Sequence, residues 1–334
     1  MYFVSYERMP QRIAKLIHNH ITERNRFLVV THQNPDGDAI GSVSAMTQWL
    51  KSIGKDITIF CVTSIPQNLM FLTHADEISH SHDVWKQPYD AIILLDSGDL
   101  TYAGVHELIP LHQPETPIIN IDHHQSNQNY GLLNFVFHHA SSATEVLYYF
   151  FEFNDIEITV PIATSLFTGL VTDTTNFSNL GTSKKALHIA SSLVKKGAQL
   201  KLVRKYILQD KTFCTLKLWG IVLNRLAIHE KTNTAYTYIT QEDLKTCGTT
   251  DEEIEGVSNL LNHLNEGKAA FVFKERSTGE IKVSMRTTCD DIDLAKIAQQ
   301  FGGGGHKKAA GFSVAGPIAT AIEDVMEKIQ NKMS

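Results

Sequence analysis

The sequence predicts an α/β protein, with a parallel sheet in the first half of the chain and a smaller α/β domain after a helical connector. Three observations favour this fold class. Apolar runs of strand length in the first half lack polar alternation, which is typical of strands buried on both faces of a parallel sheet. Segments with helical spacing alternate with these runs. The 334 residues are also enough for two domains with a sizeable core.

Four strands and three helices are expected in the first half. The predicted strands are 26–32, 56–61, 89–96 and 116–122. The first helix, 39–54, carries apolar residues at helical spacing, and Gly54 is its expected C-cap. Two further helices, 141–153 and 161–174, begin near Ser142 and Pro161, because serine favours an N-cap and proline fits the first turn of a helix.

The pattern of predicted elements changes after a helical stretch, 183–226, that contains Lys/Arg-rich segments. We predict a first domain over 1–190, a helical connector over 191–225 and a second domain over 226–334. Thr250 as an N-cap, followed by acids in the first turn, favours a helix over 250–264. The other elements expected in the second domain are strands 234–240, 268–276 and 280–288 and a helix over 291–301, which a run of four glycines follows.

Composition limits the classes of function. A net charge of −6 gives no basic field for long nucleic acid, although short phosphorylated ligands can bind through local basic groups or metal ions. The four cysteines are far apart without a CxxC pair, which argues against a cysteine zinc site and favours free thiols. No signal peptide and no apolar run of about 18 residues is seen. We therefore expect a soluble, cytoplasmic protein with no membrane partner.

Carboxylates and histidines gather where the predicted strands end. In a parallel sheet these ends lie at one edge, where ligands usually bind. The tight turn at Pro35 and Gly37 can bring the first set together, and Asp173 joins from the end of an apolar helix. The candidate residues are His32, Asp36 and Asp38 after the first strand, Asp96 with Asp99 nearby after the third, and Asp122, His123 and His124 after the fourth.

Each group has an ordinary structural explanation when it is taken alone. "NPDGD" is a common turn, Asp96 or Asp173 can cap a helix, and a His-His pair is often solvated. Together, however, carboxylates at one edge would repel one another unless cations neutralised them. The set therefore implies a metal site, and we expect two ions. A donor set of oxygen and imidazole ligands favours Mn²⁺, with Mg²⁺ or another first-row ion as the alternative. Two such ions can activate a bridging water and stabilise a phosphoryl transition state.

The order of five motifs resembles the DHH/DHHA1 phosphoesterase family over nearly the whole chain. The motifs are "HQNPDGDAIGS", "LLDSGD", "DHHQSN", "VTDT" and "VSMRT…FGGGGHKKAAG". The resemblance is to the nanoRNase/pAp phosphatase branch or to the DhhP-type phosphodiesterase branch. It implies an active site in the cleft between a DHH domain and a DHHA1 domain. After the fourth motif "TDTTNF" departs from the TDTG of many relatives, which puts the shape of that loop and its substrate contacts in doubt.

The resemblance also implies roles for individual residues. One metal is expected on His32, Asp36 and Asp96, and the other on Asp38, Asp96, His123 and Asp173, with Asp96 bridging. Asp122 is expected as a supporting acid and His124 as the group that faces the scissile phosphate. The residues expected to bind substrate are Asn127, Arg286, Gly303, Gly304, Gly305 and His306.

The glycine run also supports anion binding on its own terms. Glycine lets the backbone approach a ligand closely, with N–H groups free to bind phosphate. The run lacks the GK[ST] ending of a P-loop, so triphosphate binding is not favoured. A flexible turn is the alternative, but His306, Lys307 and Lys308 directly after the run favour an anion site. The fork of Arg286 suits a phosphate, although a plain surface charge is its alternative.

We therefore expect a two-metal phosphohydrolase that degrades short nucleotides by attack of a metal-bridging hydroxide. Its expected substrates are short RNA oligonucleotides, linear dinucleotides such as pApA, or 3′-phosphoadenosine 5′-phosphate (pAp), in a monomer or homodimer. A stand-alone cyclic di-AMP phosphodiesterase is the alternative, and a catalytically silent nucleotide-binding protein is a further one. The glycine run argues against an inorganic pyrophosphatase, and the chain has no room for the added domain of a RecJ-like exonuclease.

Overall fold

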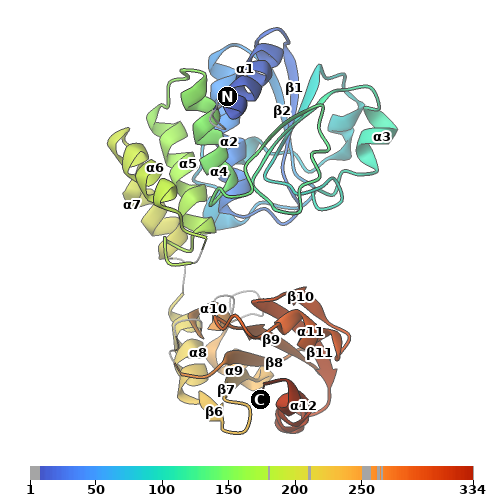
Figure 1. The fold of residues 1–334 in the computed structure, drawn as a ribbon, viewed down its shortest axis with the longest axis vertical. Coiled ribbons are helices and arrows are strands. Elements are labelled where there is room, and N and C mark those ends of the chain that lie inside the picture. The colour runs from blue at the N-terminus through green and yellow to red at the C-terminus, as the bar shows by residue number, and fades with distance from the viewer. Residues whose placement is uncertain are drawn as a thin grey trace, which may run out of the picture. The chain divides into compact units, whose positions relative to one another are not determined.

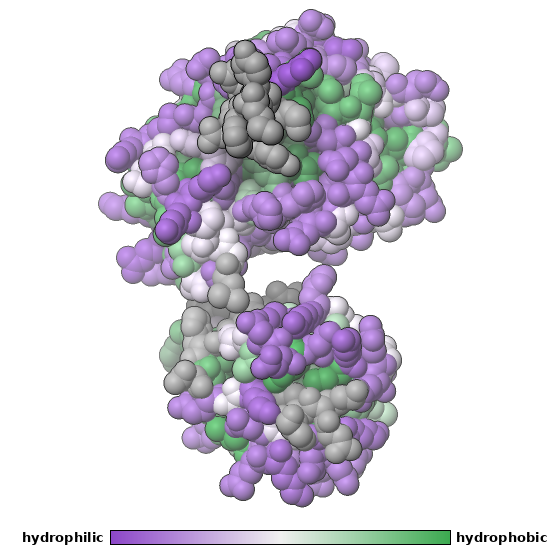
Figure 2. All heavy atoms as spheres, viewed as in Figure 1, coloured by the Kyte–Doolittle hydropathy of each residue, from purple (hydrophilic) through white to green (hydrophobic). Residues whose placement is uncertain are grey.

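The computed structural model describes residues 8–179, 181–209, 212–249, 257–261, 264 and 266–333. The chain forms two compact units, Met1–Asp210 and Lys211–Ser334, which are described separately here (Figure 1). No helix in the described residues is long and apolar enough to cross a membrane. Figure 2 shows hydrophilic side chains over much of the face in view of both units.

A five-stranded, fully parallel sheet forms the centre of the first unit, with strand order β2-β1-β3-β4-β5. All five residues of β3 are buried, which confirms the interpretation of the apolar runs. The four expected strands are present, and the short β5 was not expected, because its four residues carry little periodicity. The strands are β1 (Arg26–Val30), β2 (Asp56–Phe60), β3 (Ala91–Leu95), β4 (Ile118–Asp122) and β5 (Leu133–Val136).

Both faces of this sheet are covered. A large apolar cluster joins one face to α1, α2, α4 and α5, while a second cluster joins the other face to η3 and α3. The three expected helices are present as α2, α4 and α5, and Ser142 is the N-cap of α4. The helical elements are α1 (Arg8–Thr22), α2 (Gly37–Ser52), η1 (Gln67–Leu69), η2 (Ala75–Glu77), η3 (His82–Lys86), α3 (Leu108–His112), α4 (Ala143–Phe153), α5 (Val160–Asp173), α6 (Lys184–Lys195), α7 (Leu200–Val203) and the π-helical η4 (Arg204–Leu208).

The second unit contains a six-stranded mixed sheet of order β10-β11-β9-β8-β7-β6, in which only β7 and β8 pair in parallel. The three strands expected here are present as β7, β8 and β9. The elements are α8 (Phe213–Asn224), β6 (Ala227–His229), β7 (Thr234–Ile239), α9 (Gln241–Cys247), α10 (Val257–Leu260), β8 (Ala269–Glu275), β9 (Glu280–Arg286), α11 (Leu294–Gln299), β10 (Gly304–His306), β11 (Ala309–Ala315) and α12 (Ile318–Met333). Thr250 and the first turn of the helix expected over 250–264 lie outside the described residues.

The two faces of the second sheet are packed differently. Residues Phe271, Phe273, Val283 and Met285 join α11 and α12 in one apolar cluster. On the opposite face, Ala270 and Val272 join α8, α9 and α10 in another. Because side chains alternate along a strand, the residues of β9 between its buried positions, Lys282, Ser284 and Arg286, lie on this second face.

Candidate metal centre

The carboxyl ends of the parallel strands bring the expected acids and histidines together. Three overlapping groups in the described residues have donor atoms within 4.8 Å of one another. Their members come from segments up to 141 residues apart in the sequence, from His32 to Asp173. The groups are His32, Asp36 and Asp96; Asp38, His123 and Asp173; and Asp96, Asp122, His123 and His124.

The first group forms around the start of α2. Asp36 is the N-cap of this helix, and its Oδ1 accepts hydrogen bonds from the backbone N–H of Asp38 at 2.9 Å and of Ala39 at 3.1 Å. His32 is buried, and its Nδ1 donates to the carbonyl oxygen of Gln33 at 2.8 Å. This bond leaves Nε2 to face Asp96 Oδ2 at 3.5 Å, with the free lone pair that a metal ligand needs.

The second group is held by α4. Asp38 is fully buried, and its oxygens accept backbone hydrogen bonds from Ala143 at 2.5 Å and Thr144 at 3.0 Å, in the first turn of α4. The positive end of the helix therefore holds this carboxylate. His123 donates from Nδ1 to the carbonyl oxygen of Ala140 at 3.3 Å. Its Nε2 lies 3.3 Å from Asp173 Oδ2 and 3.9 Å from Asp38 Oδ2.

Asp96 lies between the two groups and is the least compensated carboxylate. Its side chain is 3% exposed, and Oδ1 has no hydrogen-bond partner among the described residues. Its backbone has a left-handed φ of 56°, a strained conformation that directs the side chain. Burial, together with Asp38 and Asp36, holds the pKa of Asp96 well above its usual value. Burial and the same neighbouring acids raise the pKa of Asp173 to about 10.

This electrostatic arrangement fits cations. The group of His32, Asp36 and Asp96 and the group of Asp38, His123 and Asp173 bring four carboxylates and two imidazoles to one small volume, and the described residues place no Lys or Arg in their ion pairs. A buried carboxylate without a hydrogen bond is costly unless a positive charge balances it. The donor set contains no sulfur, and Asp96 lies within reach of both groups. The residues present can therefore hold two divalent ions that share Asp96.

Asp122 and His124, which share the third group with Asp96 and His123, also form a hydrogen-bonded pair of their own. His124 Nδ1 donates to Asp122 Oδ1 at 2.7 Å, and Asn127 Nδ2 donates to Asp122 Oδ2 at 2.6 Å. Burial raises the pKa of Asp122, but these hydrogen bonds outweigh burial and leave that pKa below its usual value. The bond to Asp122 raises the pKa of His124. Because Nδ1 of His124 is engaged, only Nε2 is left to contact a ligand.

Asn127 is more enclosed than its expected role requires. It is 6% exposed, and its Oδ1 accepts hydrogen bonds from Asn120 Nδ2 at 3.0 Å and from the backbone N–H of Asn129 at 2.8 Å. Its amide nitrogen also reaches the carbonyl oxygen of Ser97. These contacts connect Asn127 to Asp122, and its contact with substrate stays a prediction.

Tyr102 is a site neighbour that the sequence patterns did not reveal. Its ring stacks on His32 with centroids 4.8 Å apart, and its edge meets the ring of His124 at 5.8 Å. The side chain remains 42% exposed. Burial and the nearby acids, Asp96 first, raise its pKa to about 12, so the hydroxyl is protonated at neutral pH. The only sequence signal is an aromatic residue six positions after Asp96.

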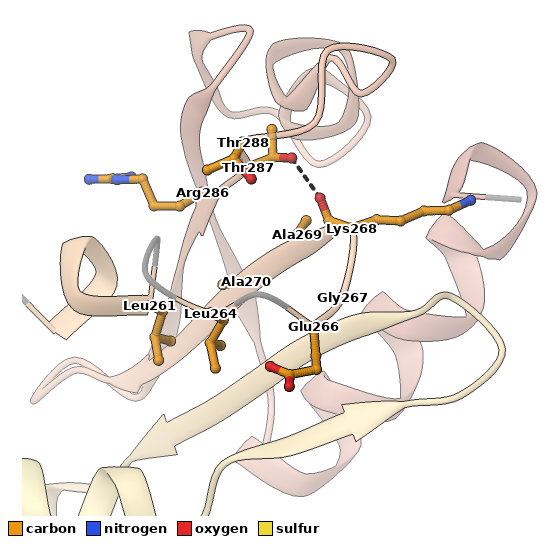
Figure 3. Close-up of a pocket in the computed structure, with 10 residues that line it drawn as sticks. All are labelled: Leu261, Leu264, Glu266, Gly267, Lys268, Ala269, Ala270, Arg286, Thr287 and Thr288. Carbon is orange, nitrogen blue, oxygen red and sulfur yellow. Dashed lines mark hydrogen bonds between the residues drawn. The ribbon is translucent and has the colours of Figure 1, made fainter. Parts of the chain in front are cut away.

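In the second unit, Arg286 and His306 lie at one level of the sheet. Arg286 pairs in register with Ala309 of β11, which pairs with His306 of β10, so both side chains lie on the same face. Arg286 lines a small hollow with Ala269 and Ala270 of β8 and with Lys268 and Thr287, which flank the two strands. Figure 3 shows the Arg286 side chain directed away from that of Lys268.

The glycine run differs from the expected loop. Its second half forms the edge strand β10, and two of its N–H groups are not free, which corrects the expectation for them. Gly302 donates to Gln299 and Gly303 donates to Ala298, so both close the C-terminus of α11. A Cβ at Gly303 or Gly305 would also collide with β11. A built Cβ would meet nothing within 4 Å at Gly302 or Gly304, but Gly302 has a left-handed φ of 74° and Gly304 does not, so Gly304 is the open position with ordinary strand backbone.

Comparison with known proteins finds one matching family model in each of the two units. The family models "DHH family, N-terminal domain" and "DHHA1 domain" match residues 26–170 and 231–334. The chain is 30% identical over 309 residues to the bifunctional oligoribonuclease and PAP phosphatase NrnA of Thermus thermophilus, covering 92% of this chain and 90% of that protein. It is 24% identical to the cyclic-di-AMP phosphodiesterase GdpP of Geobacillus thermodenitrificans, covering 88% of this chain but 45% of that protein. The crystal structure of an exopolyphosphatase-related protein from Bacteroides fragilis matches with a TM-score of 0.85 at 22% identity, over 97% of this chain and 98% of that one.

Proposed function

The chain belongs to the DHH family and carries a DHHA1 domain, and from this premise we propose that it is a metal-dependent phosphohydrolase of short nucleotides. The observation that carries the proposal is the buried carboxylate of Asp96, whose Oδ1 has no hydrogen-bond partner among the described residues, between two groups of acids and histidines. Short RNA oligonucleotides, pApA and pAp are the proposed substrates. A full-length match to a bifunctional oligoribonuclease and PAP phosphatase supports this choice.

Six side chains would hold two ions. We assign His32, Asp36 and Asp96 to one ion and Asp38, Asp96, His123 and Asp173 to the other. Support for sharing Asp96 with the second set comes from its Oδ1, which lies 3.6 Å from His123 Nε2. Mn²⁺ is the proposed ion, because mixed carboxylate and imidazole ligands suit it. Two divalent ions held by these side chains would supply Lewis acidity and a nucleophilic water for attack on phosphorus.

The remaining side chains of the first unit orient and stabilise the reacting phosphate. Asp122 accepts a hydrogen bond from Nδ1 of His124 and so fixes the orientation of the imidazole ring, which leaves Nε2 to donate to a phosphoryl oxygen. Asn127 in turn holds Asp122 through its second oxygen. We propose that Asp122 and Asn127 are positioning residues and that His124 is the group that contacts substrate.

The second unit would recognise a further part of the nucleotide. Arg286 can bind a phosphate with two N–H groups, and His306 lies on the same face one strand beyond Ala309. Gly304 leaves room for a ligand beside them. These residues, with Gly303 and Gly305 as the backbone that shapes β10, form the proposed nucleotide subsite.

The test is a turnover comparison with Mn²⁺ on pAp, pApA, cyclic di-AMP, a five-residue RNA and pyrophosphate. The proposal expects the highest kcat/KM on pAp, pApA or the short RNA. Preference for cyclic di-AMP would favour the alternative, which the weaker match to a cyclic-di-AMP phosphodiesterase keeps open. The Asp96→Asn variant, which accepts the same left-handed φ, is the control. Near-normal turnover by this variant would refute the two-metal site.

A further inference from the structure

The second sheet has a face that the described helices leave partly open. On this face, the side chains of His306 and Lys282 are exposed and that of Arg286 is half-buried, and no residue of the set defined below is fully buried. Their register is fixed: Lys282 pairs with Ser313, Ser284 with Gly311, and Arg286 with Ala309. We define the open face by these residues: Lys282, Ser284 and Arg286 of β9, Ala309, Gly311 and Ser313 of β11, and Gly304 and His306 of β10.

The middle of the open face is a floor of small residues. Gly304, Gly311 and Ser284 lie in one register row across three strands. A Cβ at Gly304 would meet nothing within 4 Å, and one at Gly311 would meet only the carbonyl oxygen of Val283 at 3.0 Å. The row therefore leaves room above the sheet. A sugar or a base can approach the backbone closely there.

Cations lie on both sides of this floor. Arg286 and His306 border it at one end, and Lys282 borders it at the other. Four residues along a strand span about 13 Å, so Arg286 and Lys282 are too far apart to hold one phosphate. Lys282 also lines a hollow with Arg276 and Ser313, beside Gly302 and Gly303.

No ion pair joins Lys282 or Arg276 to an acid within the described residues. Glu280 follows the same alternation as Lys282, but no ion pair joins these two side chains in the described part of the chain. Asp290 instead pairs with Lys308 at 2.7 Å, on the other side of Arg286 along the chain. The described residues that line the hollow at Lys282 include two cations, Arg276 and Lys282, and no acid, so its lining is positive, as in grooves that track a phosphate backbone.

We propose that the open face binds a nucleotide chain longer than two residues. Arg286 and His306 hold one phosphate, the small-residue floor accepts the sugar and base that follow, and Lys282 with Arg276 holds a phosphate further along. This inference rests on the proposed function, because it extends the nucleotide subsite of the same enzyme. It makes Lys282 a determinant of preference for oligonucleotides over pAp.

The test is charge reversal at Lys282. In Lys282→Glu, kcat/KM on a five-residue RNA should fall about tenfold, and by clearly less on pAp, since only the longer ligand reaches the second phosphate position. The slope of log KM for the RNA against log salt concentration should decrease by about 0.7, which is the change expected for the loss of one phosphate contact on a single strand. The control is Lys296→Glu, on α11 at the opposite face, where a glutamate at the third helical position suits the N-cap Asp293.

Binding without turnover separates this inference from the proposed function. Anisotropy of a labelled five-residue RNA in EDTA measures affinity when the chemistry is stopped. Weaker binding to Lys282→Glu, with wild-type binding to Lys296→Glu, supports the open face even if no substrate in the panel is hydrolysed. Equal affinities for the two variants, or an equal loss on RNA and pAp, would overturn it.

Discussion

Replacing Gly169 with alanine tests how tightly three helices hold the second group of ligands. Gly169 lies in α5, next to Asp38 from α2 and Thr144 from α4. A Cβ at this position would lie 2.5 Å from Asp38 Oδ1 and 2.4 Å from Thr144 Cγ2. Real Cβ contacts are essentially never shorter than 3.0 Å, so the carboxylate oxygen must move by about 0.5 Å or more.

The magnitude follows from what surrounds Asp38. Overpacking of this kind costs about 1–3 kcal/mol, and the better helix propensity of alanine returns about 1 kcal/mol. Folding should therefore survive. Metal-ligand distances tolerate shifts of only about 0.2 Å, whereas Asp38 must leave its hydrogen bonds to Ala143 and Thr144. We expect the apparent affinity for Mn²⁺ to fall about 10–100-fold.

The assay is metal content after dialysis against graded Mn²⁺, together with activity over the same concentrations. Gly220→Ala in α8 is the matched control, because a Cβ there meets nothing within 4 Å. That variant should gain up to about 1 kcal/mol of stability and bind metal normally. If Gly169→Ala binds Mn²⁺ like the wild type, Asp38 is not a ligand or the contact is softer than the structure indicates.

Three other predictions test the site and the fold. His123→Ala should lower metal content, since Nε2 faces three carboxylates, whereas His124→Ala should lower kcat with metal content retained; equal metal loss in both would mean that the roles are not separate. EDTA should abolish hydrolysis and Mn²⁺ should restore it, and full activity in the chelator would rule out the mechanism. Burial raises the pKa of Asp243, but its hydrogen bonds from Arg225 outweigh burial and lower that pKa. The Asp243 carboxylate therefore stabilises the fold above its unfolded pKa near 3.8, and this contribution is lost as pH falls through the lowered pKa of the folded state. Asp243→Asn should flatten the loss of stability below about pH 4 in urea melts, and an unchanged acid limb would contradict this.

The candidate metal ligands that follow the strands of the first unit could be predicted because a parallel sheet has a fixed geometry. Once the apolar runs were recognised as parallel strands, the residues after them had to meet at one edge. His32, Asp96 and His123 follow from this rule alone. The partners of these residues could not be predicted, because they come from backbone groups such as the carbonyl of Ala140 and the first turn of α4.

The glycine run shows the limit of motif reasoning. A run of four glycines indicates close backbone approach, but it does not say to what. In the folded protein, Gly302 and Gly303 close α11, and a Cβ at Gly305 would strike β11, which leaves Gly304 facing open space. The strand β10 was not expected, because glycine has low strand propensity and its pairing depends on β11.

The sequence by itself determined the fold class, the main strands and helices of the first unit and the identity of the candidate metal ligands, because hydrophobic periodicity and residue chemistry are local properties. Only the tertiary structure decided which oxygens remain unpaired, which histidine nitrogen faces the acids, and that Tyr102 lies against His32. It also decided that Arg286 and Lys282 share one face with a floor of small residues. These features depend on register and helix packing between segments distant in the chain, which no local pattern records.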